Sequence, residues 1–297
     1  MTAAAGVAAS SGLALEEVPC NLCGGDETRP FTRRGGMRVV RCTGCGLVYV
    51  NPRSQVRDLE LHYNSGASSR IEYYLDAEAA DRRTFAGILR LVGRLAPKGG
   101  SLLDVGPCTG TFLTQAREAG FEVHGVEINA SAARYCRERG LDVRTGVLAS
   151  DSYPSGSFDL VVMGDVLEHV PDPLQTLRDA ARVLRAGGHV VISTPNIESA
   201  AARLLQVKPE EHLYYFAAAT LEAVLRKAGL MPVQITTLDR YRNLTAMTHS
   251  TTCGRLFGRL APAFRLAHRL AGDVVLKLPL RENLLGVGRK PGGEAAP

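Results

Sequence analysis

The sequence contains no tryptophan, and only 6% of its residues are aromatic. Proteins that grip single-stranded nucleic acid stack bases on aromatic side chains, so this scarcity argues against such a role. No apolar run approaches the ~18 residues that a membrane helix needs, which argues against a membrane partner. The first twelve residues carry no lysine or arginine, so they lack the basic region of a signal peptide. We expect residues 1–14 to form a disordered leader.

The rest of the composition is that of an ordinary globular protein. Hydrophobic residues make up 45% of the 297 residues and charged residues 22%, which is enough to build a buried core. The length favours one large domain plus a small one. A net charge of +5 allows an anionic ligand, but it does not by itself indicate nucleic-acid binding.

Four of the seven cysteines form two close pairs, Cys20 with Cys23 and Cys42 with Cys45. Two residues between thiolates let both sulfurs face one ion, and four thiolates close a tetrahedral shell. The separation of the pairs also fits a structural zinc site, whereas four unrelated free thiols would not be expected to show this pattern. A secreted disulfide scaffold would be shorter and richer in cysteine, so we expect a reducing, cytoplasmic setting.

The segment around these cysteines resembles a zinc ribbon. Gly24 and Gly46 each follow the second cysteine of a pair, where a tight turn needs a positive φ. Short strands are expected over residues 37–41 and 47–50. We place this ribbon at residues 15–52.

Strand and helix patterns alternate through the rest of the chain. Residues 53–97 are expected to form a linker and an amphipathic helix, which covers 74–95, and residues 98–297 the large domain. The expected strands are 101–105, 121–126, 141–144, 158–163, 189–193 and 231–237, and the expected helices are 111–118, 130–138, 173–185 and 220–227. This alternation predicts an α/β fold with a largely parallel sheet, whose ligands bind at the carboxyl ends of the strands.

One strand of this pattern leads into a glycine-containing turn that a helix follows. Gly106 and Gly110 allow the backbone to pass close to a ligand, and the helix start offers free N–H groups. Glu127 ends the next strand, 21 residues after Gly106, where a carboxylate can accept hydrogen bonds from ribose hydroxyls. Pro107 and Cys108 interrupt the dinucleotide fingerprint, which disfavours hydride transfer. For Glu127 the alternative is a surface carboxylate without a ligand.

Several motifs in this order resemble those of class I S-adenosylmethionine-dependent methyltransferases. They are Asp104-Val-Gly106-x-x-x-Gly110, Glu127, the run from Phe158 to Val170 that includes Asp165-Val-Leu-Glu168-His169, Val183-Leu-Arg-Ala-Gly-Gly188 and Thr194-Pro-Asn196. The resemblance covers about residues 101–233, and residues 284–289 look like the last strand of that family. It implies a Rossmann-like, seven-stranded mixed sheet with helices on both faces and an antiparallel last strand.

The resemblance also implies roles for particular residues. By it, Asp104, Gly106 and Gly110 surround the methionine part of S-adenosylmethionine, and Glu127 holds the ribose. Val147 and Leu148 would flank the adenine, and Asp165 would lie beside the methionine part or the acceptor. Two positions depart from the family pattern. Cys108 stands where glycine, alanine or serine is common, and Val147 where an acidic residue often reads the adenine amino group.

Two histidines are candidates for a general base, since imidazole titrates near neutral pH. His169 follows the fourth main strand, at the active-site end of the sheet, and a structural role is the alternative. His212 lies between the fifth strand and the next helix, in a loop that could close over an acceptor. Its alternative role is to anchor that loop, with Leu213 and Phe216 packing below it.

The sequence favours methyl transfer to a small-molecule acceptor, a sugar or specialised metabolite, with O-methylation as the first expectation. The C-terminal part from Arg240 is basic and includes an amphipathic pattern over 256–270. This part could recognise a phosphate-bearing or carrier-bound acceptor. The alternative is that its charged residues only form a solvated face of the protein. An RNA base methyltransferase is a second hypothesis, because the ribbon carries Arg29, Arg33, Arg34, Arg38 and Arg41. A non-catalytic binding protein with a degenerate cofactor site, suggested by Cys108, is a third.

Overall fold

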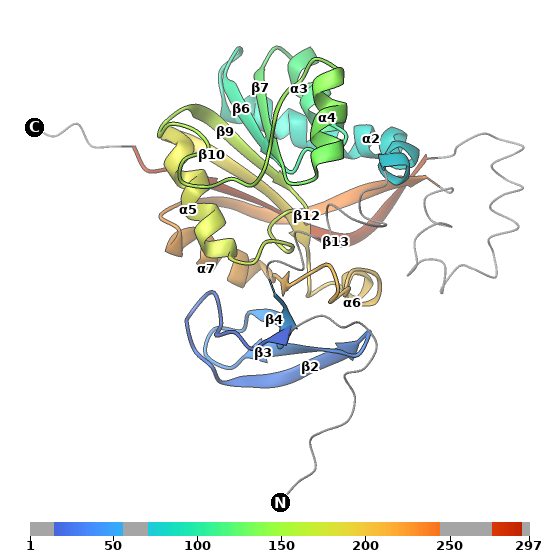
Figure 1. The fold of residues 1–297 in the computed structure, drawn as a ribbon, viewed down its shortest axis with the longest axis vertical. Helices are drawn as coiled ribbons and strands as arrows, with labels where there is room; N and C mark the ends of the chain where they lie inside the picture. The colour runs from blue at the N-terminus through green and yellow to red at the C-terminus, as the bar shows by residue number, and fades with distance from the viewer. Residues whose placement is uncertain (1–14, 56–70, 244–274, 293–297) are drawn as a thin grey trace, which may run out of the picture.

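The computed structural model describes residues 15–55, 71–243 and 275–292. In these residues a seven-stranded sheet carries helices on both faces, and a small second sheet lies against one side of it (Figure 1). The expected leader and the amphipathic pattern over 256–270 lie outside the described residues. None of the described helices combines the length and the apolar character needed to cross a membrane.

The large sheet has the strand order β12-β13-β10-β9-β6-β7-β8. Its strands are β6 (Ser101–Val105), β7 (Glu122–Glu127), β8 (Asp142–Thr145), β9 (Phe158–Gly164), β10 (Leu184–Pro195), β12 (Met231–Asn243) and β13 (Val275–Arg289). The adjacent strands β10, β9, β6, β7 and β8 run parallel to one another, whereas β13 runs antiparallel between β10 and β12. The expected mixed sheet with an antiparallel last strand is confirmed.

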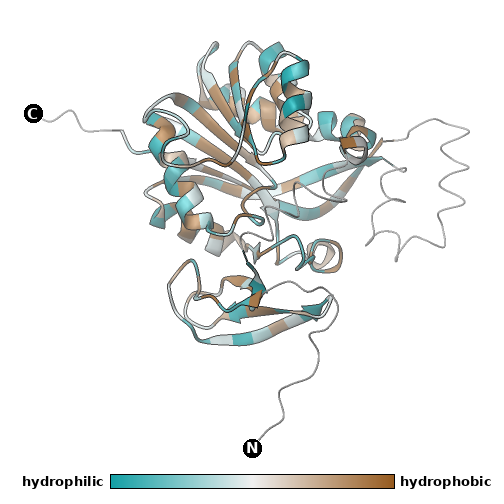
Figure 2. Ribbon diagram, in the orientation of Figure 1, coloured by the Kyte–Doolittle hydropathy of each residue, from teal (hydrophilic) through white to brown (hydrophobic). Residues whose placement is uncertain are grey.

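Two different groups of helices cover the two faces of this sheet. They are α2 (Ile71–Leu95), α3 (Thr111–Glu118) and α4 (Ala130–Glu138) on one face, and α5 (Pro173–Val183) and α7 (Ala218–Lys227) on the other. Adjacent strand residues point to opposite faces, so Leu102 packs with the first group and Leu103 with the second. Apolar residues accordingly follow the strands and the inner sides of the helices (Figure 2).

The small sheet is a ribbon that contains the two cysteine pairs. It has the order β11-β4-β3-β2, with β2 (Thr28–Arg34), β3 (Met37–Cys42), β4 (Val48–Val50) and β11 (Tyr214–Tyr215). A separate pair joins β1 (Leu15–Glu16) to β5 (Arg53–Ser54). Strand β11 comes from the large domain, in the chain between α6 (Ala200–Leu205) and α7.

Some element boundaries differ from the sequence expectation. The helix expected over 173–185 ends at Val183, because Leu184 already pairs with Phe158 of β9 and begins β10. Strands β12 and β13 extend beyond their expected ends, because they pair with each other as far as Asn243 and Val275. Strand β2 was not predicted, since its segment is mostly exposed, contains Pro30 and has five polar residues in seven.

The amino ends of β6 and β9 are joined by Asp159. Its Oδ2 accepts hydrogen bonds from the backbone N–H of Ser101 at 2.8 Å, from the Ser101 hydroxyl at 3.2 Å and from Arg185 at 2.5 Å. Burial raises the pKa of Asp159, but these donors outweigh it and the pKa is lowered from the ordinary 3.8. The ionised carboxylate therefore stabilises the end of the sheet remote from the glycine turn.

Replacing Asp159 should destabilise the protein in a pH-dependent way. We expect Asp159→Ala to lower the free energy of unfolding by about 1–2 kcal/mol at pH 7, measured by urea unfolding. Because the pKa is lower in the folded state, this contribution is present above the unfolded value and is lost as the pH falls through the folded one. The parent–variant difference should thus shrink from pH 7 to pH 3. Asp151→Ala, at an exposed acid, is the control and should show neither effect.

Candidate active site and metal centre

The turn between β6 and α3 needs glycine at two positions. Gly106 has φ 75°, and a Cβ there would lie 2.8 Å from Val166 Cγ2. Gly110, the residue before α3, has φ 74°, and a Cβ there would lie 2.5 Å from Leu141 Cδ1. Larger residues at either position would therefore collide with the packed core as well as strain the backbone. The turn brings the chain to the carboxyl end of β6, as the sequence predicted.

Glu127 joins this turn to the one that follows β7. Its Oε2 accepts a hydrogen bond from the Cys108 backbone N–H at 2.9 Å, and its Oε1 accepts one from the Asn129 N–H at 2.8 Å. The side chain is buried, which raises its pKa, and the backbone N–H groups of Asn129, Cys108 and Ile128 oppose that rise. The surface-carboxylate alternative is therefore wrong. Each oxygen keeps a further lone pair with which it could accept a ligand hydroxyl.

Cys108 takes part in the turn through its backbone. Its φ is 51°, its N–H reaches Glu127, and its carbonyl accepts the Cys136 thiol at 3.2 Å. Burial and the nearby Glu127 carboxylate raise the pKa of the Cys108 thiol well above its usual value. The thiol is therefore neutral, and the turn around it keeps its hydrogen bond to Glu127.

The other cofactor candidates lie along the same edge of the sheet. Asp104, near the end of β6, is buried, and burial together with Glu127 raises its pKa well above the usual range. Gly146 donates its N–H to the Glu127 carbonyl at 2.8 Å, which brings the turn after β8 to the same place. In that turn Leu148 is buried, whereas Val147 is 55% exposed.

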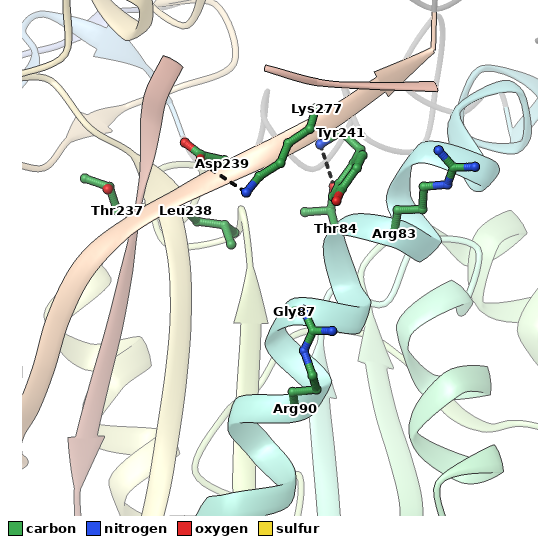
Figure 3. A pocket seen from close by; sticks show the side chains of 9 residues that line it. All are labelled: Arg83, Thr84, Gly87, Arg90, Thr237, Leu238, Asp239, Tyr241 and Lys277. Carbon is green, nitrogen blue, oxygen red and sulfur yellow. Dashed lines mark hydrogen bonds and ion pairs between the residues drawn. The ribbon is translucent and has the colours of Figure 1, made fainter. Parts of the chain in front are cut away.

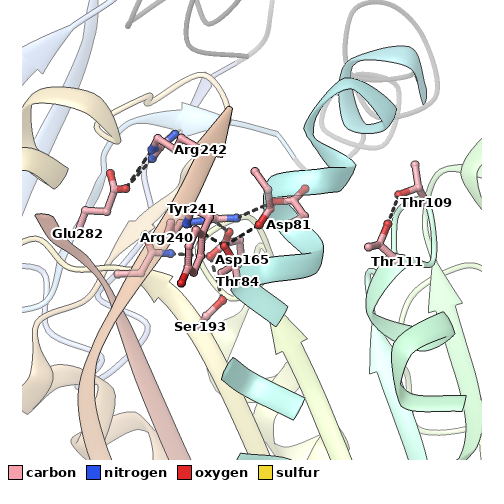
Figure 4. Close-up of polar contacts among 12 residues, drawn as sticks. Asp81, Thr84, Thr109, Thr111, Asp165, Ser193, Arg240, Tyr241, Arg242 and Glu282 are labelled. Atoms are coloured by element: carbon pink, nitrogen blue, oxygen red, sulfur yellow. Dashed lines mark hydrogen bonds and ion pairs between the residues drawn. The ribbon is translucent and has the colours of Figure 1, made fainter. Parts of the chain in front are cut away.

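Asp165 forms the centre of a polar network at the end of β9 (Figure 4). It has φ 54°, and its Oδ1 accepts hydrogen bonds from Ser193 at 3.1 Å and Asn283 at 2.8 Å. Its Oδ2 pairs with Arg240 of β12. Arg240 also approaches Asp81 of α2 at 3.8 Å. Burial raises the pKa of Asp81 to about 6, and the neighbouring Asp165 adds to that effect while Arg240 opposes it.

Sequence reasoning missed most of the partners in this network. Arg240 was considered only as part of a basic segment, and Asp81 and Asn283 were not singled out. No local motif announces them, because Arg240 is 75 positions from Asp165 and Asn283 is 118 positions away. Only the placement of β12 and β13 beside β10 brings them to the end of β9.

The structure brings the two candidate histidines together. The rings of His169 and His212 have centroids 4.6 Å apart and are nearly perpendicular. His169 Nδ1 lies 2.9 Å from the Glu211 carbonyl, so it is the protonated nitrogen and donates. Burial lowers the pKa of both imidazoles, most strongly that of His212. Both rings are thus neutral, which leaves a lone pair for a proton but makes each a weak base.

A carboxylate completes this histidine group. Glu168 is buried, its Oε2 accepts the Thr194 hydroxyl at 2.9 Å, and its Oε1 has no hydrogen-bond partner among the described residues. One ligating atom from each of Glu168, His169 and His212 lies within 4.8 Å of the others, so the group could hold a metal ion. Leu213 and Phe216 are buried, which the loop-anchor interpretation of His212 also requires.

The four cysteines of the ribbon form a second group. One sulfur atom from each lies within 4.8 Å of the others, and the Cys20–Cys45 and Cys23–Cys42 sulfurs are 3.4 Å apart. All four are free thiols, and a tetrahedral zinc site with bonds of about 2.3 Å has sulfur–sulfur edges of roughly 3.8 Å. The cluster therefore fits a zinc ion.

The two cysteine turns share one backbone pattern. Gly24 donates to the Cys20 carbonyl at 2.7 Å, and Gly46 donates to the Cys42 carbonyl at 3.1 Å. Both glycines have φ near 80°, as the sequence predicted. Burial raises the pKa of Cys42, but the N–H groups of Cys45 and Gly44, together with contacts from neighbouring thiols, lower it to about 7. Such donors favour the thiolate form that a metal requires.

A separate pocket of about 230 Å³ lies between α2 and the β12–β13 pair (Figure 3). Among its charged groups, Lys277 lies 3.5 Å from Asp239, and Arg83 donates to the Val275 carbonyl at 3.3 Å. The volume is below the roughly 300–1,000 Å³ of ordinary ligand pockets. The candidate site is centred instead on the ends of β6, β7 and β9, where Glu127 and Asp165 lie.

Comparison with known proteins identifies the large domain. A family model described as "Methyltransferase domain" matches residues 76–235. The ubiquinone biosynthesis O-methyltransferase of Ralstonia nicotianae is 32% identical over 191 residues, which cover 56% of this chain and 79% of that protein. The protein of the same name from Thiobacillus denitrificans is 32% identical over 178 residues, covering 53% and 75%.

Solved structures show the same fold. A SAM-dependent methyltransferase from Archaeoglobus fulgidus matches with a TM-score of 0.53 and 22% identity, over 73% of this chain and 99% of that one. A chain of the complex between the Haloferax volcanii Trm112 methyltransferase activator and a methyltransferase matches with a TM-score of 0.51 and 19% identity, over 71% and 89%. The family model begins after the ribbon.

The first prediction from this site concerns Glu127. We expect Glu127→Ala to weaken S-adenosylmethionine binding about 10- to 100-fold in titration calorimetry, since the variant loses charged acceptors and leaves two N–H groups unpaired. Glu122→Ala, at the exposed start of the same strand, is the matched control and should bind as the parent does. Equal affinity in Glu127→Ala and the parent would reject the assignment.

The second concerns the cysteine cluster. Purified protein should contain one zinc ion per chain, measured by elemental analysis, and Cys20→Ser should lose it because three thiolates leave the shell open. Cys108→Ala, a cysteine outside the cluster, should retain the full amount. Metal-free parent protein of normal stability would contradict the zinc assignment.

Proposed function

The chain belongs to the methyltransferase-domain family, and on that premise we propose that this S-adenosylmethionine-dependent methyltransferase methylates an oxygen atom of a small-molecule acceptor. Relatives about 30% identical are named as O-methyltransferases of ubiquinone biosynthesis, which supports an oxygen acceptor. The observation that carries the proposal is the buried Glu127 carboxylate, which lies between the turns after β6 and β7.

The residues of the sheet edge suit an adenosyl sulfonium. Glu127 would accept the ribose hydroxyls, while the Gly106–Gly110 turn and Asp104 would surround the methionine part. Leu148, which is buried, and Val147, which is exposed, would flank the adenine. When bound, the sulfonium supplies an activated methyl group, so the chain itself must align the acceptor and exclude water.

The acceptor side lies around Asp165 and the histidine pair. Arg240, Ser193 and Asn283 hold the Asp165 carboxylate in one orientation beside the methionine part. A hydroxyl acceptor must lose its proton, and His169 has an Nε2 lone pair because its Nδ1 proton is directed to the Glu211 carbonyl. His212 packs against that ring and keeps it in place. A positioned base contributes about 10²–10⁴-fold to such a reaction.

The contacts of three of the five ribbon arginines disfavour the RNA hypothesis. Arg34 donates to backbone carbonyls of the large domain, Arg38 pairs with Glu17, and Arg41 lies over the Phe31 ring. These side chains are engaged within the protein rather than arranged as a stacking surface. The degenerate-site hypothesis is also weakened, because Cys108 keeps the turn closed onto Glu127.

Methyl transfer can be tested directly with labelled S-adenosylmethionine. Catechols, nucleotide sugars and total RNA should be offered in parallel, and each product analysed by mass spectrometry for an added methylene mass. We expect an O-methylated small molecule, a drop of about 10²–10⁴-fold in kcat for His169→Ala, and nearly unchanged cofactor affinity.

Three outcomes would contradict the proposal. Methylated RNA bases without a small-molecule product would favour the RNA hypothesis. Label appearing on nitrogen or carbon would reject an oxygen acceptor. A full rate in both His169→Ala and His212→Ala would remove the general base and leave alignment alone.

A further inference from the structure

The ribbon is physically continuous with the acceptor-side loop of residues 206–216. Strand β11 of this loop pairs with β4 of the ribbon, where Tyr214 lies opposite Tyr49. The Val50 N–H also donates to the Leu213 carbonyl at 2.9 Å. The loop therefore forms the outer strand of the four-stranded ribbon sheet.

The other side of the same loop is bonded to the segment that carries the candidate base. Leu213 and Tyr214 both donate their N–H groups to the Glu168 carbonyl, at 2.7 and 3.2 Å. His212 stands directly before these residues and packs against His169. The loop thus lies between the ribbon and the active-site end of β9, and it is hydrogen-bonded to both.

Arginine side chains strengthen this attachment from the ribbon side. Arg34 Nη1 donates to the carbonyls of Leu204 and Val207, both at 2.9 Å, at the start of the loop. Arg53 Nη1 donates to the Tyr214 hydroxyl at 3.0 Å and to the Pro171 carbonyl at 2.7 Å. Of these acceptors, the Val207 carbonyl and the Tyr214 hydroxyl belong to the loop, which has only one two-residue strand of its own among the described residues.

The metal-binding cysteines and the loop also share a hydrophobic core. Cys20, Cys42 and Tyr49 belong to the same buried cluster as Leu213 and Phe216. On the other side of the ribbon, buried residues of β3 and β4 pack with residues of the loop, namely Val39, Val48 and Val50 with Val207 and Tyr215. The cysteine cluster and the loop thus pack against the same buried residues.

We propose that the metal-loaded ribbon is the internal positioning module of the acceptor-side loop and that it holds His212 against His169. This inference rests on the proposed function. Small metal-binding modules fold with their metal, and a two-residue strand is not stable without a partner. Without the metal, the ribbon strands separate, β11 loses β4, and the loop detaches while the glycine turn and Glu127 remain in place.

Hydrogen exchange with and without metal tests this coupling independently of the acceptor. Zinc-loaded parent protein is compared with Cys20→Ser, and amide exchange is followed by mass spectrometry over 206–216 and over the cofactor turn 104–110. We expect exchange to rise about tenfold or more in 206–216 and S-adenosylmethionine affinity to stay within about twofold. Unchanged exchange in 206–216 after metal loss would overturn the inference. Absent S-adenosylmethionine binding in the parent would instead overturn the proposed function.

Two neighbouring arginines provide a test that leaves the metal in place. Arg34 reaches the loop, whereas Arg33 is exposed, and no contact of its side chain is found among the described residues. We expect Arg34→Ala to shift the His212 imidazole signals in NMR spectra and to raise exchange in 206–216, with zinc content and cofactor affinity unchanged. Arg33→Ala should behave as the parent in every measurement.

A conservative variant of Arg34 distinguishes a positioning role of this side chain from a general effect on the stability of the protein. Both carbonyls bond to one nitrogen of Arg34, so Arg34→Lys can restore the contacts with a single ammonium group. It should recover the parent NMR signals and the parent exchange in 206–216. Identical NMR signals in Arg34→Ala, Arg33→Ala and the parent would overturn the inference.

Discussion

The carboxylates at the carboxyl edge of the parallel sheet, of which Glu127 and Glu168 are buried and Asp165 is half-buried, are the constraint on which this molecule depends. A carboxylate removed from water costs free energy unless donors replace the lost hydration. Glu127 obtains two backbone N–H groups, Asp165 obtains donors from β10, β12 and β13, and Glu168 obtains a hydroxyl from β10. Each carboxylate therefore connects neighbouring strands or turns through hydrogen bonds or ion pairs. The same interactions position the residues of the candidate site.

The antiparallel last strand explains how the proposed acceptor side is assembled. Insertion of β13 between β10 and β12 places Asn283 and Arg240 beside the end of β9. The long pairing of β12 with β13 then extends past the sheet and presents Arg240 to α2 as well. The candidate cofactor edge and the proposed acceptor edge thus meet at Asp165.

The ribbon is an integral part of the same architecture. Its sheet contains a strand of the large domain, and its cysteines share a core with the loop that carries His212. A small module with few apolar residues gains stability from metal and from packing on a larger neighbour. In return it satisfies backbone groups in a loop that could not satisfy them by itself.

The sequence by itself determined the local features: the cysteine turns with Gly24 and Gly46, the alternation of strands and helices, and the Gly106–Gly110 turn followed by Glu127. These depend on residues close together in the chain, where spacing and backbone conformation suffice. Only the tertiary structure decided that Arg240 reaches Asp165, that His212 meets His169, and that β11 joins β4. Such contacts link distant segments, and strand order and packing, which no local pattern encodes, bring them together.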